Sequence, residues 1–132
     1  MADLKGKDKL FETGKKKIKE ENKVSEKDIL RYLRALERYL NNLARRKDLY
    51  PPMAKRLRLE GSLTVRFKLR KDGSVDNNSI KVMVSSGYSI LDKGAVKLIK
   101  KYVPLFAKKK GIKPPKDNLT IELPITFEII GW

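Results

Sequence analysis

Few side chains in this sequence can do chemistry, and their types exclude most catalytic and metal-binding sites. The 132 residues contain no cysteine and no histidine, so the thiol nucleophile is missing, as are the usual general base and the commonest metal ligand. Catalysis would therefore need paired carboxylates or an activated lysine. The acids instead fall in a turn (Asp72), near a helix start (Asp92) and on outward strand positions (Glu122, Glu128). We expect neither an enzyme nor a metal or cofactor site.

The charge balance points to anionic partners, although it is also typical of a solvated surface. The chain has 32 Lys plus Arg against 16 Asp plus Glu, a formal net charge of +16. Such a surface favours nucleic acid, anionic lipid, lipopolysaccharide or a cell-wall polymer. Specific nucleic-acid binding by a sheet needs aromatic residues on its exposed face, whereas Phe67 and Phe127 fall on the apolar faces of their strands. Non-specific polyanion binding through the basic loop at 108–116 remains an alternative.

Two segments differ in composition. Residues 1–24 are rich in lysine and poor in large apolar side chains, which predicts a flexible tail or linker. Residues 25–132 have the composition of a single domain. No apolar run approaches the roughly 20 residues of a membrane span, and the start of the chain has no signal-peptide pattern. We expect the chain as given to be soluble.

Apolar periodicity predicts two helices. The first follows Ser25, and its stripe recurs at spacings of 4, 3, 4 and 3: Ile29, Leu33, Leu36, Leu40 and Leu43. A coiled-coil seam has the same spacing but needs more heptads than this one has. The second helix is expected to begin at Ser89, with Asp92 completing a capping box, and to end at Val103–Pro104. Its expected buried stripe is Leu91, Ala95, Leu98 and Tyr102.

Three strands are predicted by alternation of apolar and polar residues. The first runs over 62–69, and a turn containing Gly73 leads to a second strand with Ile80, Val82 and Val84 on one face. The third runs from Leu119 to about Ile130. The result is an α+β, two-layer ββαβ domain, with a three-stranded antiparallel sheet and an extra N-terminal helix before it.

Two observations predict the strand order 2-1-3. The outward face of the first strand carries Arg66 and Lys68, and that of the third carries Glu122 and Glu128, so these strands are favourable neighbours. Pro124 cannot donate a ladder hydrogen bond, which places the third strand at an edge. Such an edge either is protected by its proline alone or accepts an extended peptide as an added strand.

Several motifs, in order, resemble the C-terminal domain of TonB proteins. They are "YPPMA" at 50–54, Gly61 with "LTVRF", "KDGSV" at 71–75, "SSGYSILDKGAV" at 85–96 and the final "LTIELPITFEI". Their order and spacing agree over roughly residues 28–130. The resemblance implies a receptor-binding domain in the periplasm, whose last strand pairs with the TonB box of outer-membrane transporters. Energy from the inner-membrane proton motive force would arrive through ExbB and ExbD and drive uptake of iron-siderophore, haem or cobalamin.

The resemblance also assigns roles to particular residues. The receptor-pairing strand corresponds to Leu119, Thr120, Ile121, Glu122, Leu123, Ile125, Thr126 and Phe127. A second receptor contact corresponds to Ala54, Lys55 and Arg56. The structural motif positions are Tyr50, Pro51, Gly61, Asp72, Gly73 and Gly87, with Gly61 expected to relieve the backbone where the first strand begins.

Two departures from the family pattern concern the part before the domain. The family's inner-membrane anchor is not found, because no apolar run is long enough. Its proline-rich spacer is not found either, because no proline precedes Pro51. We therefore expect the chain to correspond to part of a longer, membrane-anchored parent. Isolated domains of this family can also intertwine as homodimers, and an exposed sheet edge makes self-association a further alternative.

Overall fold

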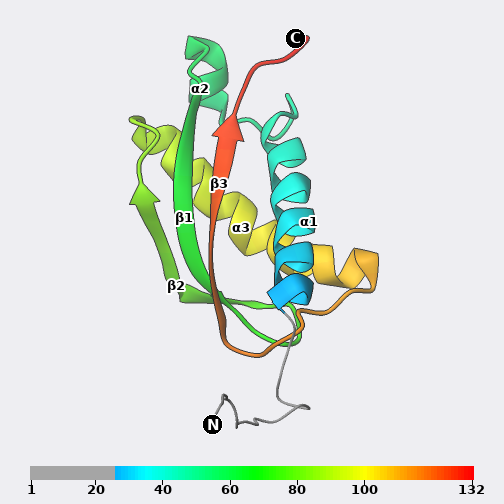
Figure 1. The fold of residues 1–132 in the computed structure, drawn as a ribbon. Coiled ribbons are helices and arrows are strands. Elements are labelled where there is room, and N and C mark those ends of the chain that lie inside the picture. Colours follow the sequence, from blue (N-terminus) through cyan, green and yellow to red (C-terminus); the bar gives the residue numbers. More distant parts are fainter. Residues whose placement is uncertain (1–25) are drawn as a thin grey trace, which may run out of the picture.

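The computed structural model describes residues 26–132, so the predicted tail at 1–24 and the Ser25 cap lie outside the described residues. Three helices and three strands follow one another as shown in Figure 1: α1 (Glu26–Ala44), α2 (Pro52–Leu57), β1 (Gly61–Leu69), β2 (Val75–Val84), α3 (Ser89–Lys110) and β3 (Leu119–Phe127). The predicted α+β class and the extra N-terminal helix are confirmed.

The three strands form one antiparallel sheet in the order β2-β1-β3, as predicted. β1 and β3 pair without interruption from Gly61 opposite Phe127 to Leu69 opposite Leu119. The predicted charge complementarity is present, because the Arg66 guanidinium donates to the Glu122 carboxylate at 2.7 Å. Pairing between β1 and β2 is less regular, with two register shifts along β1.

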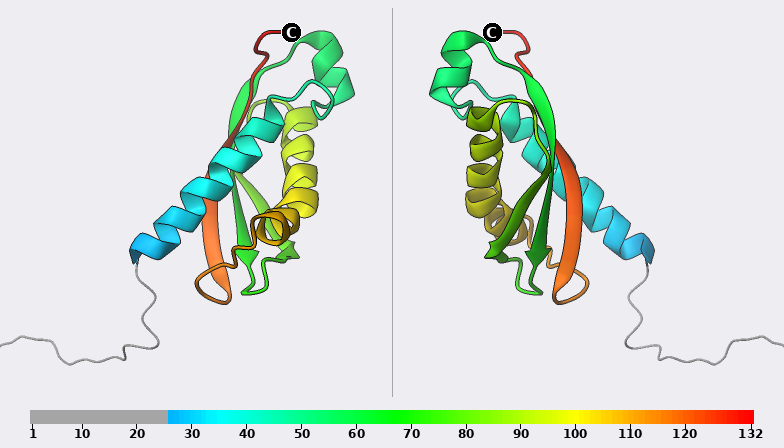
Figure 2. Two further views of the ribbon diagram at one scale, coloured as in Figure 1. Left: turned by 90° about the vertical axis from the view of Figure 1, so that its right-hand side faces the viewer. Right: turned by 90° about the vertical axis from the view of Figure 1, so that its left-hand side faces the viewer.

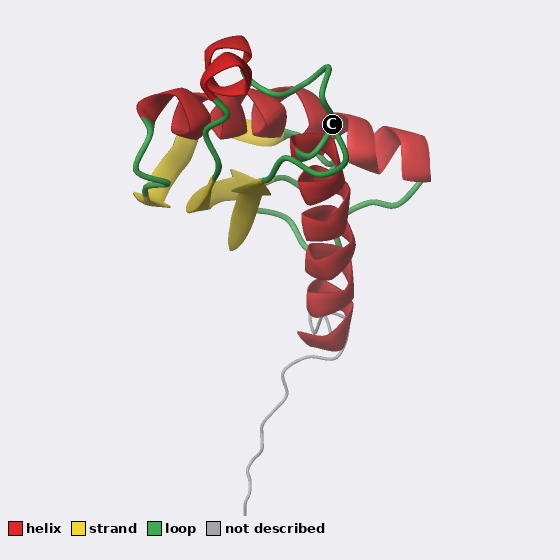
Figure 3. Cartoon of the chain, turned by 90° about the horizontal axis from the view of Figure 1, so that it is seen from above, coloured by secondary structure: helices red, strands yellow, loops and turns green. Residues whose placement is uncertain are grey.

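One face of the sheet is covered by α3 and the other face is uncovered, while α1 crosses the edge strand β3 (Figures 1 and 2). Figures 1 and 2 show α3 behind the sheet and α1 alongside β3, at the opposite side of the domain from β2. Seen from above in Figure 3, α3 lies along one face of the strands, and α1 lies beside them at the edge formed by β3. Alternation in β1 and β3 therefore sends one set of side chains into the core and the other set into solvent.

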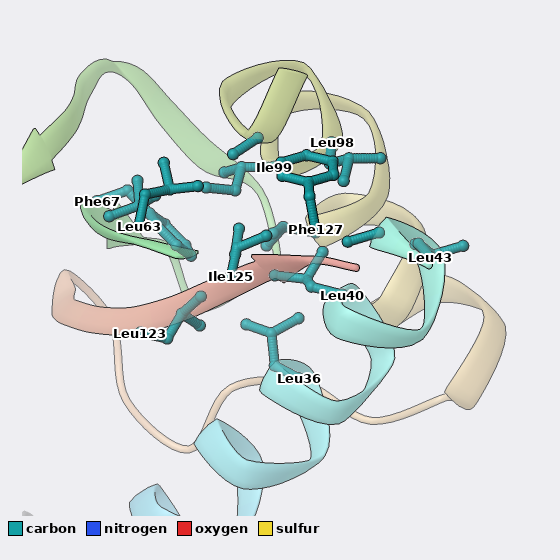
Figure 4. Packing of buried hydrophobic residues seen from close by; sticks show 14 of the residues in the cluster. Leu36, Leu40, Leu43, Leu63, Phe67, Leu98, Ile99, Leu123, Ile125 and Phe127 are labelled. Carbon is teal, nitrogen blue, oxygen red and sulfur yellow. The ribbon is translucent and has the colours of Figure 1, made fainter. Parts of the chain in front are cut away.

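The core lies between α1, α3 and the inner faces of β1 and β3. Leu36 and Leu40 of α1 point at β3, where Leu123, Ile125 and Phe127 meet them (Figure 4). Each of these five side chains is at most 1% exposed. Burial of such a side chain contributes about 1.5–3 kcal/mol, so the packing of α1 on β3 is a large part of what keeps this strand in place.

The predicted end of the second helix at Val103–Pro104 is wrong, because α3 continues through Pro104 to Lys110. A proline inside a helix costs about 3 kcal/mol through a lost hydrogen bond and a steric clash. The residues after it offset that cost, since Phe106 and Ala107 are buried. Phe106 packs against the rings of Tyr32 and Tyr39 in α1, at centroid distances of 5.4 and 5.2 Å.

The predicted cap of this helix is also corrected. The N-cap residue is Tyr88, not Ser89, and no side chain caps it. Asp92 reaches back instead to the end of β2, where its carboxylate accepts from the Ser86 N–H at 3.0 Å and from the hydroxyls of Ser85 and Ser86. Burial acts to raise the pKa of Asp92, but these hydrogen bonds outweigh it and leave the pKa below its ordinary value.

Three further expectations differ from the structure. Val82 and Val84 of β2 are 36% and 60% exposed, because the irregular pairing of this strand does not hold them against the helices. β3 ends at Phe127 rather than near Ile130. The short helix α2 was not predicted, although Pro52 at its first position is a residue that helix starts favour.

Candidate functional site

The candidate site is the edge of β3 that faces away from β1. Backbone groups of a strand point alternately to its two sides. The side chains of Ile121, Leu123, Ile125 and Phe127 are buried, and those of Thr120, Glu122 and Pro124 are exposed. The N–H group of Thr126 and the carbonyl of Pro124 bond away from β1, so the even-numbered residues of β3 direct their backbone to the free edge.

Pro124 lies where its missing N–H group removes no hydrogen bond from the sheet. It stands opposite Thr64 of β1, and because its backbone faces the free edge, the β1–β3 ladder keeps all its donors. The predicted edge position is therefore confirmed by the strand order. A strand added at this edge would find the carbonyl of Pro124 but no donor there.

The edge is not wholly open, because Asn41 of α1 already bonds to part of it. The Asn41 side-chain oxygen accepts from the Thr126 N–H at 2.7 Å, and its nitrogen donates to the Pro124 carbonyl at 3.0 Å. One side-chain amide thus makes the pair of hydrogen bonds that one residue of a neighbouring strand would make. Within residues 26–132, no further strand pairs with this edge, which leaves the outward groups of Thr120 and Glu122 for a partner.

A groove of about 540 Å³ runs between α1 and the last part of β3. Its strand side is formed by Pro124, Thr126 and Glu128, and its helix side by Arg34, Glu37, Arg38, Asn41, Asn42 and Arg45. The Arg45 guanidinium pairs with the Glu128 carboxylate at 3.5 Å. Among the described residues, no ion pair is formed by Arg34 or Arg38. The groove is therefore polar and carries unpaired positive charge on its helix wall.

Sequence reasoning did not identify this helix wall, although a signal for it was present. Arg34, Arg38, Asn41 and Arg45 recur at spacings of 4, 3 and 4, which places them on one face of a helix. This polar stripe runs beside the apolar stripe that predicts α1. Its significance depends on which strand lies next to α1, and the sequence of α1 does not contain that information.

The Tyr-Pro turn before α2 is tied to the segment before β1 and to the end of β3, which lie at the same end of the sheet. The Tyr50 hydroxyl donates to the Leu59 carbonyl at 2.5 Å, which closes the segment between α1 and β1. Its ring packs edge-on against Phe127 at 5.4 Å and against Trp132 at 4.8 Å. Burial, and to a smaller extent the carboxylates of Glu60 and Glu128, raises the pKa of Tyr50. The end of β3 is thereby held against the turn.

The turn is also fixed on α3, through a contact that only glycine permits. A Cβ atom at Gly94 would lie 2.6 Å from Cγ of Pro51, so the proline ring rests on the backbone of α3. In α2, Ala54 is fully buried, whereas the Lys55 ammonium donates to the Lys47 carbonyl at 3.1 Å and Arg56 is exposed. A partner at this helix would therefore meet Lys55 and Arg56, and Ala54 would only position them.

The remaining motif residues have structural surroundings that explain their types. Gly73 has φ +93° and lies so close to α3 that an added Cβ would stand 2.3 Å from the Ala107 Cβ. Asp72 accepts from the Ser74 side chain and backbone N–H, which lowers its pKa. Gly87 has φ +96° with open space around it. At Gly61 the constraint is the close approach of Ser86, 3.1 Å from an added Cβ, rather than backbone freedom.

Two other kinds of feature are not found among the described residues. Within residues 26–132, no group of three or more acidic side chains is placed to hold a metal ion. Over the same residues, none of the helices combines the length and the apolar character needed to cross a membrane.

Comparison with known proteins gives consistent results. Residues 46–129 match the family model described as "Gram-negative bacterial TonB protein C-terminal". The TonB proteins of Helicobacter pylori strains 26695 and J99 are each 34% identical over 83 residues, which is 63% of this chain. The chain covers only 26% and 27% of these relatives. It therefore spans about a quarter of the length of the curated relatives that it matches.

A solved structure agrees in fold as well as in sequence. The solution structure of the Helicobacter pylori TonB C-terminal domain superposes with a TM-score of 0.53 at 28% identity. The alignment covers 74% of this chain and 92% of that one. The family model matches well over half of the chain, including the Tyr-Pro turn and the edge strand. The chain belongs to the family of Gram-negative bacterial TonB C-terminal domains.

Proposed function

We propose that this domain binds the TonB box of outer-membrane transporters by adding it as a strand at the free edge of β3. The site lies in the periplasm, and the longer parent protein is anchored in the inner membrane and energised by an ExbB–ExbD complex. The transported cargo is an iron-siderophore, haem, cobalamin or a similar nutrient. In this function the domain is a binding module that passes on force and has no catalytic role.

One observation carries the proposal: β3 is a 9-residue edge strand held in unbroken register on β1. Its outward backbone groups at Thr120 and Glu122 are directed to a side where no described strand lies. Each main-chain hydrogen bond to an added strand contributes about 0.5–1.5 kcal/mol net of water. A few such bonds, less the cost of ordering the peptide, predict weak to moderate affinity, and the main-chain bonds themselves depend little on the peptide's sequence. Those properties suit a domain that serves several receptors.

The Tyr-Pro turn supports a role in passing tension from the preceding helix into the sheet. Pro51 packs on Gly94 of α3, and Tyr50 packs on Phe127 at the end of β3. A pull on the chain before this turn would reach the receptor-pairing strand through packed groups with little slack. Replacing both Pro51 and Pro52 by alanine is expected to reduce transport in cells that carry the full-length variant. Transport at the wild-type rate would contradict this role.

The test is a titration of the isotope-labelled chain with a peptide that carries a receptor TonB box, at two salt concentrations. We expect backbone amide shifts concentrated on β3, from Leu119 to Phe127, that remain on β3 at both salt concentrations. The absence of shifts on β3 at saturating peptide would overturn the proposal. Shifts at Lys55 and Arg56 with a longer receptor segment would support α2 as the second contact.

The competing function is non-specific polyanion binding, favoured by the lysines at the end of α3. Lys108, Lys109 and Lys110 are exposed, and Lys113 and Lys116 follow in the next loop. A polyanion would shift the amides of this segment and would lose affinity steeply with salt, because counterions are released on binding. Shifts confined to residues 108–116 in the same titration would rank this function first.

A further inference from the structure

We infer that the segment that adds to β3 is acidic. We also infer that the Asn41 side chain of α1 occupies part of that segment's site on β3 until the segment binds. This inference rests on the proposed function and deepens it, because it names the chemistry of the partner and a second wall for the site. The first wall is the edge of β3, and the second is the arginine-bearing face of α1 across the groove. An extended peptide on β3 would lie between the two.

The charges on the helix wall determine which peptide fits. Arg34 and Arg38 line the groove, are exposed, and form no ion pair among the described residues. Glu37 lies between them on the same wall, so that a continuous acidic run is less favourable than spaced acids. Residues four apart on a helix are separated by about 6 Å along its axis. Alternate residues of a strand are about 6.6 Å apart, so acids at alternate positions of the peptide match the two arginines.

Asn41 determines how far along β3 the peptide can pair. Its amide makes the two hydrogen bonds that the incoming strand needs at Pro124 and Thr126. The outward groups of Thr120 and Glu122 are not used in this way, so a short peptide can pair there without competition. A peptide as long as β3 must displace Asn41, and contacts with the arginines would offset the two hydrogen bonds that are lost. Full-length pairing is therefore selective for acidic peptides.

The first experiment needs no variant of the protein. Three peptides matched to the 9-residue length of β3 carry glutamate, glutamine or lysine at alternate positions and are titrated into the isotope-labelled chain. We expect the glutamate peptide to bind roughly three- to tenfold more tightly than the glutamine peptide at low salt. That advantage should disappear at high salt, because the pairs are exposed. The Asn41 side-chain amide and the Thr126 backbone amide should shift with the glutamate peptide.

The outcomes separate this inference from the function on which it rests. Equal binding of the glutamate and glutamine peptides, with β3 amides shifted by both, would leave strand addition in place and overturn the acidic preference. No shift of β3 amides with any peptide would overturn both. Saturation of β3 by the glutamate peptide with no change at Asn41 would overturn its displacement.

Charge variants are expected to change the affinity for the glutamate peptide in opposite directions, which a general loss of stability would not do. Arg34→Gln with Arg38→Gln should weaken binding of the glutamate peptide several-fold, and Glu37→Gln should strengthen it. The matched control removes two charges from exposed positions of α3 outside the basic segment at 108–116, as Lys97→Gln with Lys100→Gln, and should change binding much less. Asn41→Ala should tighten binding of the 9-residue peptide but not of one that spans only Thr120 to Glu122. Equal effects of the paired arginine and lysine variants would overturn the inference.

Discussion

The two edges of the sheet are built differently, although both belong to strands of similar length. β3 pairs with β1 without a break over all 9 of its residues, and α1 packs along it. β2 has 10 residues and two register shifts, and its end exposes Val82, Met83 and Val84. Register shifts of this kind twist an edge and make it a poor template for another strand. The edge with the regular pairing, that of β3, is thus the one along which α1 packs.

Under the proposed function, protecting an edge and using it for binding require different structural features. β2 is protected by irregularity, which also makes it unsuitable for pairing. β3 keeps a regular edge, whose protection comes from Pro124 and from the side chain of Asn41 in α1, which we infer to be displaced when a strand is added. A binding edge needs the second kind of protection, because only a removable guard allows a strand to be added.

The largest expected effect is the loss of packing between α1 and β3. Leu40 is fully buried against β3, so Leu40→Ala removes apolar contacts and leaves a cavity. We expect a loss of about 2–5 kcal/mol in the free energy of unfolding, measured by chemical denaturation. Leu30 of the same helix is 47% exposed, and Leu30→Ala is expected to cost much less. Equal costs would show that α1 does not depend on its contact with β3.

The second effect concerns the turn that joins β2 to β1. Gly73→Ala combines a positive φ with a clash against Ala107 of α3, and we expect a loss of about 2–4 kcal/mol. Gly87→Ala is a matched control, since Gly87 has nearly the same φ but open space around it. It should cost only about 1 kcal/mol. The difference between the two variants measures how tightly the β1–β2 turn is held on α3.

The third effect is a dependence on pH at the other end of β2. The pKa of Asp92 is lowered in the folded protein, so its hydrogen bonds to Ser85 and Ser86 stabilise the fold above its ordinary value of 3.8. That stability is lost as the pH falls through the lower, folded pKa. Denaturation midpoints between pH 6 and roughly pH 2 should therefore decrease more for wild type than for Asp92→Asn. Parallel curves would mean that Asp92 does not secure the end of β2.

Features that follow from residue type could be predicted, and features that follow from tertiary packing could not. The strand order followed from Arg66, Glu122 and Pro124 although the charged pair is 56 positions apart, because the sign of a charge and a missing donor are visible in the sequence of each strand. The run of α3 past Pro104 could not be predicted, since its compensation comes from Phe106 packing on tyrosines some seventy residues earlier in the chain. The Asn41 contact was missed for the same reason, as it joins residues 85 positions apart.

The smallest expected effect concerns the charged residues opposite Arg66 on the two strands that pair with β1. Arg66 of β1 stands opposite Glu122 on β3 and opposite Lys81 on β2, so it has an attractive neighbour on one side and a repulsive one on the other. Lys81→Glu should raise the free energy of unfolding by about 0.2–1 kcal/mol, and high salt should abolish the gain. The measurement is a pair of denaturation curves at low and high salt, with Lys81→Gln as the control that removes repulsion without adding attraction. If Lys81→Glu gained nothing over Lys81→Gln, the register shifts would hold β2 too far from Arg66 for its side chains to pair, and the contrast between the edges would be still larger.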